Sequence, residues 1–293
     1  MLSSIGADAA TALIEAFAML ISLCNEVIRE LPLPRQFEFA RKVGYDGVEI
    51  APFTLGDDPH LLPAGKRAEI RRAAADAGIA ITGLHYLLLS PAGLSITSAD
   101  ASQRTRTVDV MRRFCGLAAD LGGKVLVHGS PAQRRLEPGR EAESRKWAVE
   151  CFAAVADTAA EAGVTYCIEP LAPPENELLT TVEEVAAVVR AIDNPAVRTM
   201  IDCSAAGRAE TQAIPDLIRQ WLPTGLIGHI HLNDPNRRGP GEGDLAFAPI
   251  LAAVTEVGYG GMAAVEPFIY EPDGPACAAR AIGYVRGAME GRG

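Results

Sequence analysis

Eight short apolar runs alternate with longer segments of helical periodicity along this sequence of 293 residues. Because a nearly continuous apolar run buries both of its faces, such runs are typical of parallel strands covered by helices. Eight strand–helix units favour a closed barrel over an open doubly wound sheet, and no GxGxxG follows the first run to indicate a dinucleotide fold. The sequence therefore predicts an α/β protein, a single (β/α)8 barrel of the TIM type. Its strands are predicted at residues 19–24, 47–50, 79–85, 124–128, 165–170, 199–202, 226–232 and 261–266.

The segments between these runs have the apolar spacing of amphipathic helices. Thr181 stands three residues before Glu184, which is the spacing of a capping box at a helix start. No linker or low-complexity tract divides the chain, so we expect one barrel domain over residues 18–293. Residues 1–17 are predicted to be an N-terminal extension of helical character. The clearest helical segments are residues 66–77, 105–121, 141–162, 182–192 and 247–257.

The composition indicates which partners and which cellular compartment to expect. The formal net charge is −10, and because an acidic surface repels phosphate backbones we expect no nucleic-acid partner. The short basic clusters in predicted loops are Arg134-Arg135 and Arg237-Arg238. No apolar run reaches the roughly 18 residues of a membrane span, and the first residues lack the basic region of a secretory signal. The six cysteines show no CxxC spacing, which indicates reduced thiols in a cytoplasmic protein.

Polar residues stand at the carboxyl ends of most predicted strands. In a closed barrel these ends meet at one face, where barrel enzymes place their chemistry. Side chains scattered over some two hundred positions would therefore converge on one point. The residues concerned are Glu49, His85, His128, Glu169, Asp202, His231 and Glu266.

Four of these residues predict a metal site. Converging carboxylates without a cation would repel one another and take up protons, so Glu169, Asp202 and Glu266 together with His231 indicate one divalent metal. Three carboxylates and an imidazole suit Mn²⁺ best here, with Mg²⁺, Co²⁺ and Zn²⁺ as alternatives. His229 competes with His231 as a ligand, because residues two apart on a strand share a face.

Several motifs in fixed order resemble one known family, the sugar phosphate isomerase/epimerase group of xylose isomerase-like barrels, and within it the ketose 3-epimerases most closely. The resemblance runs from about residue 19 to 285. It is carried by the segments at residues 44–49, 167–171, 200–202, 229–234, 240–243, 258–261 and 265–268, and by Arg237.

The resemblance implies roles for individual residues. It implies metal ligation by Glu169, Asp202, His231 and Glu266, with the two glutamates also acting as acid and base. Glu175 and Arg237 then correspond to residues that contact sugar oxygens. We expect His85, His128 and Glu49 to contribute further substrate contacts, or hydrogen bonds to neighbouring side chains. Family members of this size often form dimers or tetramers, so the resemblance is also compatible with a homo-oligomer.

One position departs from the family pattern. Where the family commonly has a histidine that contacts substrate, three residues after the aspartate ligand, this sequence has Ala205. The neighbouring Ser204 is a candidate substitute. Because this contact is missing, the resemblance does not carry ketose specificity over directly.

The expected function is that of a metal-dependent sugar isomerase or epimerase, which abstracts a proton beside a carbonyl. A lyase or dehydratase resembling inosose dehydratase would use the same site. A non-catalytic or partner-dependent barrel subunit is a third hypothesis. DNA repair of the endonuclease IV type is disfavoured, because Ala205 and the stretch 235–239 lack the extra metal ligands of that branch.

Overall fold

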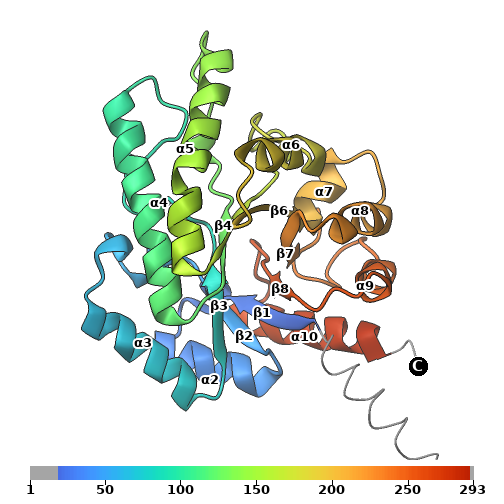
Figure 1. The fold of residues 1–293 in the computed structure, drawn as a ribbon. Helices are drawn as coiled ribbons and strands as arrows, with labels where there is room; N and C mark the ends of the chain where they lie inside the picture. The colour runs from blue at the N-terminus through green and yellow to red at the C-terminus, as the bar shows by residue number, and fades with distance from the viewer. Residues whose placement is uncertain (1–18, 291–293) are drawn as a thin grey trace, which may run out of the picture.

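The computed structural model describes residues 19–290 and shows eight parallel strands around a common axis (Figure 1). The strands follow one another in sequence order, and β8 pairs with β1 to close the barrel. The predicted (β/α)8 barrel is therefore confirmed, whereas the predicted extension at residues 1–17 lies outside the described residues. The strands are β1 (Leu20–Cys24), β2 (Gly47–Ile50), β3 (Ala80–Leu84), β4 (Val125–His128), β5 (Thr165–Ile168), β6 (Val197–Asp202), β7 (Ile227–Leu232) and β8 (Met262–Val265).

Helices connect the strands and form the outer layer (Figure 1). Short 3-10 helices, η1 (Asn25–Ile28), η2 (Pro52–Leu55), η3 (Pro59–Leu61), η4 (Ala132–Arg134) and η5 (Leu222–Thr224), lie in the connections. The α-helices are α2 (Leu33–Val43), α3 (Ala64–Asp76), α4 (Ala101–Leu121), α5 (Glu141–Ala162), α6 (Val182–Ile192), α7 (Cys203–Ala209), α8 (Ile214–Trp221), α9 (Phe247–Glu256) and α10 (Gly274–Glu290).

Helix starts depend on local caps. Helix α6 begins as predicted, since the Thr181 hydroxyl accepts a hydrogen bond from the backbone N–H of Glu184. The Glu184 carboxylate accepts a hydrogen bond from the N–H of Thr180 at 2.6 Å. In a capping box the donor would be the N–H of the next residue, Thr181. Helix α4 begins four residues before the predicted start, because Asp100 caps it by accepting from the N–H of Ser102.

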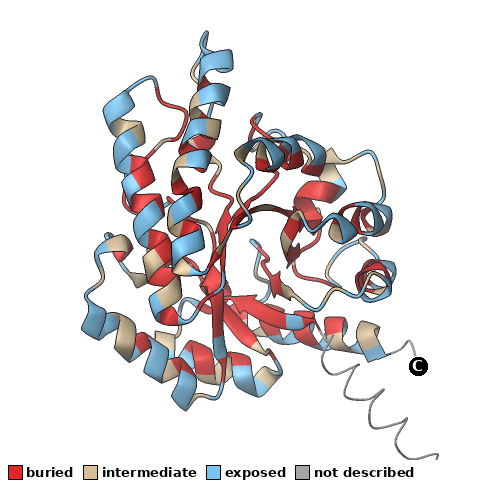
Figure 2. Cartoon of the chain, viewed as in Figure 1, coloured by how far each residue is buried: buried red, intermediate tan, exposed pale blue. Residues whose placement is uncertain are grey.

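The two faces of each strand have different neighbours. Side chains on the outer face pack against the helices in one large core, and most strand residues are buried (Figure 2). The inner face is filled by a smaller cluster of Val125, Val127, Cys167 and Met200. Space inside the barrel is limited: a Cβ on Gly228 would lie 2.8 Å from the Cys167 sulfur.

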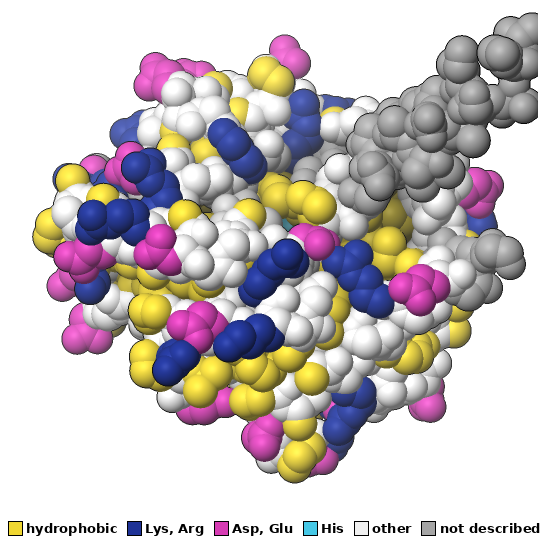
Figure 3. All heavy atoms as spheres, turned by 90° about the horizontal axis from the view of Figure 1, so that it is seen from below, with side chains coloured by type: hydrophobic (Ala, Val, Ile, Leu, Met, Phe, Trp, Pro, Cys, Tyr) yellow, Lys and Arg dark blue, Asp and Glu magenta, His cyan; other side chains and the backbone are white. Residues whose placement is uncertain are grey.

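The outer surface carries both signs of charge. On the face of the described residues seen in Figure 3, basic and acidic side chains are interspersed. Exposed ion pairs also form within single helices, such as Arg35–Glu38 in α2 and Lys66–Glu69 in α3. Among the helices of residues 19–290, none has the length and apolar content that a membrane crossing requires.

Candidate metal centre and its pocket

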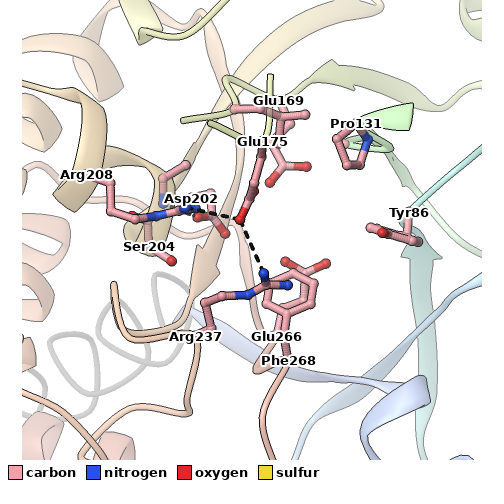
Figure 4. Close-up of a pocket in the computed structure, with 13 residues that line it drawn as sticks. Tyr86, Pro131, Glu169, Glu175, Asp202, Ser204, Arg208, Arg237, Glu266 and Phe268 are labelled. Carbon is pink, nitrogen blue, oxygen red and sulfur yellow. Dashed lines mark hydrogen bonds and ion pairs between the residues drawn. The ribbon is translucent and has the colours of Figure 1, made fainter. Parts of the chain in front are cut away.

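Four of the predicted strand-end residues lie together at the carboxyl ends of β5, β6, β7 and β8. Glu169, Asp202, His231 and Glu266 each place one ligand atom within 4.8 Å of the others. All four are at most 5% exposed, and the three carboxylates line a cavity of about 130 Å³ (Figure 4). These four strands are consecutive in the barrel and form a row. The two glutamates come from the first and last strand of this row, β5 and β8. Asp202 and His231 lie between them.

The electrostatics of this quartet favour a cation. Burial raises the pKa of Glu169 well above its usual value, and Glu266 and Asp202 raise it further. Burial, with Glu266, raises the pKa of Asp202 to about 6. Burial alone would lower the pKa of His231, but Glu266 and Glu49 outweigh it and raise that pKa well above its usual value. A divalent cation would remove this repulsion, and three carboxylates with one imidazole are a donor set that such cations accept.

Glu49 lies beneath the quartet rather than in the pocket wall. His231 has Nδ1 2.9 Å from Glu266 Oε2 and Nε2 3.1 Å from Glu49 Oε1. Burial would raise the pKa of Glu49, but His229 and His231 hold it well below its usual value. A metal-binding histidine commonly has its second ring nitrogen on a carboxylate, which fixes the ring. Glu49 is placed to do this for His231.

His229 belongs to the same buried layer. Its Nε2 lies 2.8 Å from Glu49 Oε2, and its ring centre lies 5.0 Å from that of His231. The two rings share the inner face of β7, as their spacing requires. Only His231 is part of the quartet, because it stands two residues nearer the mouth of the barrel.

Asn233 and Gly129 position the carboxylates. The Asn233 side-chain amide donates to Asp202 Oδ2 at 2.7 Å and to the backbone carbonyl of Glu266 at 3.2 Å, and its oxygen accepts from the N–H of Ser204. Gly129 faces Glu169 so closely that a Cβ would lie 1.5 Å from its Oε2. The position of the Glu169 carboxylate therefore depends on a glycine in the loop after β4.

His85 lies next to the quartet without lining the cavity. Its Nε2 is 2.8 Å from Glu26 Oε2 and 3.9 Å from Glu266 Oε1. Burial alone would lower the pKa of His85, but the carboxylates of Glu26, Glu49 and Glu266 outweigh it and raise that pKa. Cys24, Glu26, His85 and Glu266 form a second close group. Burial raises the pKa of the Cys24 thiol, which disfavours the thiolate form that binds metals.

The structure does not bring His128 to the pocket. Residues Val125 and Val127 of β4 face the barrel interior, so the alternation of side chains turns His128 toward the helices. There its Nδ1 lies 2.7 Å from the Tyr166 hydroxyl, and its ring packs edge-on against Phe152 of α5. Burial and Arg134 lower the pKa of His128 well below its usual value. His128 is a neutral residue of the helix–barrel core.

Glu175 and Arg237 line the same cavity. Glu175 Oε1 accepts a hydrogen bond from Arg208 Nη1 at 3.0 Å and lies 3.5 Å from Arg237 Nη1 (Figure 4). The Arg237 guanidinium stacks on Phe268, 4.9 Å from the ring centre. Tyr86, Pro131 and Leu171 complete the apolar part of the wall.

Three residues of the site were not predicted from the sequence. Asn233 stands two residues after His231, so the strand period placed it on the same face. Arg208 follows Ser204 by four residues, so the helical period of α7 brings both to the pocket. The sequence places Arg134 in a short basic cluster of a predicted loop, but the side chain is fully buried and donates to backbone carbonyls. No signal in the sequence distinguishes it from a surface arginine.

The comparisons with known proteins agree with this architecture. The chain matches the family described as Xylose isomerase-like TIM barrel over residues 37–287. It is 29% identical to D-psicose 3-epimerase of Agrobacterium fabrum, over 79% of this chain and 78% of that protein. It is 30% identical to L-ribulose 3-epimerase of Mesorhizobium japonicum, over 82% and 76% respectively.

Solved structures show the same fold. D-psicose 3-epimerase of Clostridium cellulolyticum H10, solved with D-tagatose, superposes with a TM-score of 0.79 at 21% identity, over 92% of this chain and 99% of that chain. With a family match across most of its length, this chain belongs to the xylose isomerase-like TIM barrel family.

Proposed function

We propose that this protein is a divalent-metal-dependent sugar epimerase or isomerase in which Glu169 and Glu266 are the acid and base. The observation that carries the proposal is the row formed by β5 to β8, in which the two glutamates flank Asp202 and His231. The named relatives are sugar 3-epimerases, which supports an enzyme of this class acting on a carbohydrate.

The residues support proton transfer beside a carbonyl. When bound, a divalent metal, for which we propose Mn²⁺ from the donor set, would polarise a carbonyl and acidify the neighbouring C–H. One glutamate removes that proton, and the other returns a proton. Return to the opposite face of the same carbon inverts its configuration, and transfer to the neighbouring carbon interconverts an aldose and a ketose. Tyr86, Leu171 and Phe268 form an apolar part of the wall beside these carboxylates.

Deuterium exchange tests this reaction. Incubation in D₂O with ketoses, aldoses and inososes should place deuterium on a carbon beside a carbonyl, as followed by NMR. A 3-epimer, an aldose–ketose pair or a dehydrated product would then identify the reaction. Exchange with none of these substrates, in protein loaded with metal, would contradict the proposal.

Variants of the two glutamates test their roles. Glu169→Gln and Glu266→Gln should each lower kcat at least about 1,000-fold, because each removes a group that exchanges the proton. His128→Gln, in the helix–barrel core, is the control and should change kcat by less than about threefold. Near-normal turnover in either glutamate variant would contradict the two-base mechanism.

We also propose a cytoplasmic location, a small-molecule substrate and a homo-oligomeric state for this protein. The six cysteines are buried and free, as we expect of a cytoplasmic protein. The cavity of about 130 Å³ beside the metal quartet supports a small-molecule substrate. The mass of the protein in solution tests whether it forms a homo-oligomer.

A further inference from the structure

One side of the pocket carries two arginines on a single carboxylate. Arg208 and Arg237 come from α7 and from the loop after β7, and both contact the same Glu175 oxygen (Figure 4). The exposed fractions of their side chains are 24% and 48%. Because one carboxylate neutralises one guanidinium, this side of the pocket keeps an excess of positive charge.

Arg237 is fixed in place while its donors stay available. Its backbone has φ 71°, in the left-handed region, and its carbonyl accepts hydrogen bonds from the N–H groups of Phe268 and Ile269. Among residues 19–290 its guanidinium makes an ion-pair contact with Glu175 and stacks on Phe268, but it donates no hydrogen bond. A guanidinium held in this way is preorganised to bind a planar or tetrahedral anion.

Ser204 supplies an independent observation. Its side chain is 1% exposed and lines the cavity, and its hydroxyl oxygen has no hydrogen-bond partner among the described residues. Buried hydroxyl groups nearly always have a partner, and an oxygen of a bound anion would supply one for Ser204. The small side chain of Ala205 leaves space beside it.

We infer that the substrate carries an anionic group, a carboxylate or a phosphate, next to its reacting carbons, and that Ser204, Arg208 and Arg237 bind it. This inference rests on the proposed function. A neutral sugar carries no charge to pair with the second guanidinium, since Glu175 offsets only one of the two. A divalent cation on Glu169, Asp202 and Glu266 would offset two of their three negative charges and so reduce their repulsion of such a group.

Calorimetric titration of the metal-loaded protein tests the inference with three probes. These are 2-keto-D-gluconate, D-fructose 1-phosphate and neutral D-fructose. At least one anionic probe should bind about tenfold or more tightly than D-fructose, because charge-assisted hydrogen bonds are the stronger class. The tighter of the two anions identifies the group as a carboxylate or a phosphate.

Two variants separate the anion site from general effects. Arg208→Gln should weaken binding of the preferred anion about 10- to 100-fold, and it should weaken binding of D-fructose much less than that. Ser204→Ala should weaken anion binding in the same direction, and it serves as the second test if Arg208→Gln fails to fold. Arg219→Gln is the charge-matched control, since Arg219 is an exposed residue paired with Asp216 and Glu256 on α8 and α9.

The outcomes distinguish this inference from the proposed function. Equal binding of anionic and neutral probes, or equal losses for both in Arg208→Gln, would overturn the inference. If deuterium then still enters D-fructose, the proposed function stands without it. Anion binding with deuterium entering no probe would leave the anion site in place and remove the proposed function.

Discussion

At the scale of single residues, the site depends on close approaches that only certain side chains allow. Gly129 is the clearest case, because the Glu169 carboxylate occupies the space where a side chain at residue 129 would lie. No other residue type fits without moving that carboxylate. Asn233 acts in a similar way on Asp202 through its amide hydrogen bond.

Gly129→Ala should weaken metal binding about 10- to 100-fold, because the added methyl group displaces the Glu169 carboxylate. Losing a group that supports a metal ligand reduces metal affinity by a similar factor. Titration with Mn²⁺, followed by calorimetry, measures the change in Kd. Gly116→Ala in α4 is the control, since a Cβ there meets nothing within 4 Å, and it should leave the Kd unchanged. An unchanged Kd in Gly129→Ala would show that Glu169 is not held at this position.

The residues also show what the sequence could predict. Glu49, Glu169, Asp202 and Glu266 were identified because a charge at the end of an apolar strand is unusual. His128 satisfied the same criterion but faces the helices. In a parallel barrel both faces of a strand are apolar, so the pattern could not reveal which residues point inward.

At the scale of elements, one buried arginine connects three segments around the pocket. Arg134 in η4 donates to the carbonyls of Glu169 at 2.6 Å, of Leu178 at 2.8 Å and of His128 at 3.3 Å. Burial lowers its pKa to about 10, so it stays charged at neutral pH. It thereby joins the ends of β4 and β5 to the loop before α6.

Arg134→Met should lower the free energy of unfolding by about 3 kcal/mol, because it leaves buried carbonyls without donors. It should also weaken Mn²⁺ binding, since the backbone of Glu169 loses a contact. Urea denaturation and metal titration measure the two effects. Arg135→Met, at the exposed neighbouring position, should change neither, and a similar loss in both variants would contradict the structural role of Arg134.

The strands and most helices were predictable to within a few residues, because the apolar period repeats in every unit. Helix α4 began earlier than predicted, since Asp100 caps it and the apolar pattern starts only later. The loops that carry Glu175 and Arg237 could not be built from periodicity. Their packing against one another depends on contacts between residues far apart in the sequence.

At the scale of the whole molecule, metal binding and protonation are linked. The raised pKa values of Glu169 and Asp202 mean that the metal-free protein binds protons more tightly than the unfolded chain does. This contribution to stability is fully present below the unfolded-state pKa of about 4 and is lost as the pH rises through about 6, the folded-state pKa of Asp202. A metal bound to these carboxylates would displace these protons.

The stabilisation by metal should therefore grow with pH. We expect the rise in Tm on adding Mn²⁺ to chelator-treated protein to be small at pH 5 and at least about 4 °C larger at pH 7.5. Differential scanning calorimetry across this range measures it. A rise in Tm of equal size at both pH values would show that these carboxylates do not exchange protons for the metal.

The central claim is that Glu169, Asp202, His231 and Glu266 hold one divalent metal, and metal analysis tests it most directly. Chelator-treated protein, reconstituted with Mn²⁺ and freed of excess ion, is compared with His231→Ala and with His229→Ala. We predict about one ion per chain in the native protein and in His229→Ala, and almost none in His231→Ala. No bound metal in the native protein, or full occupancy in His231→Ala with loss in His229→Ala, would contradict the assignment.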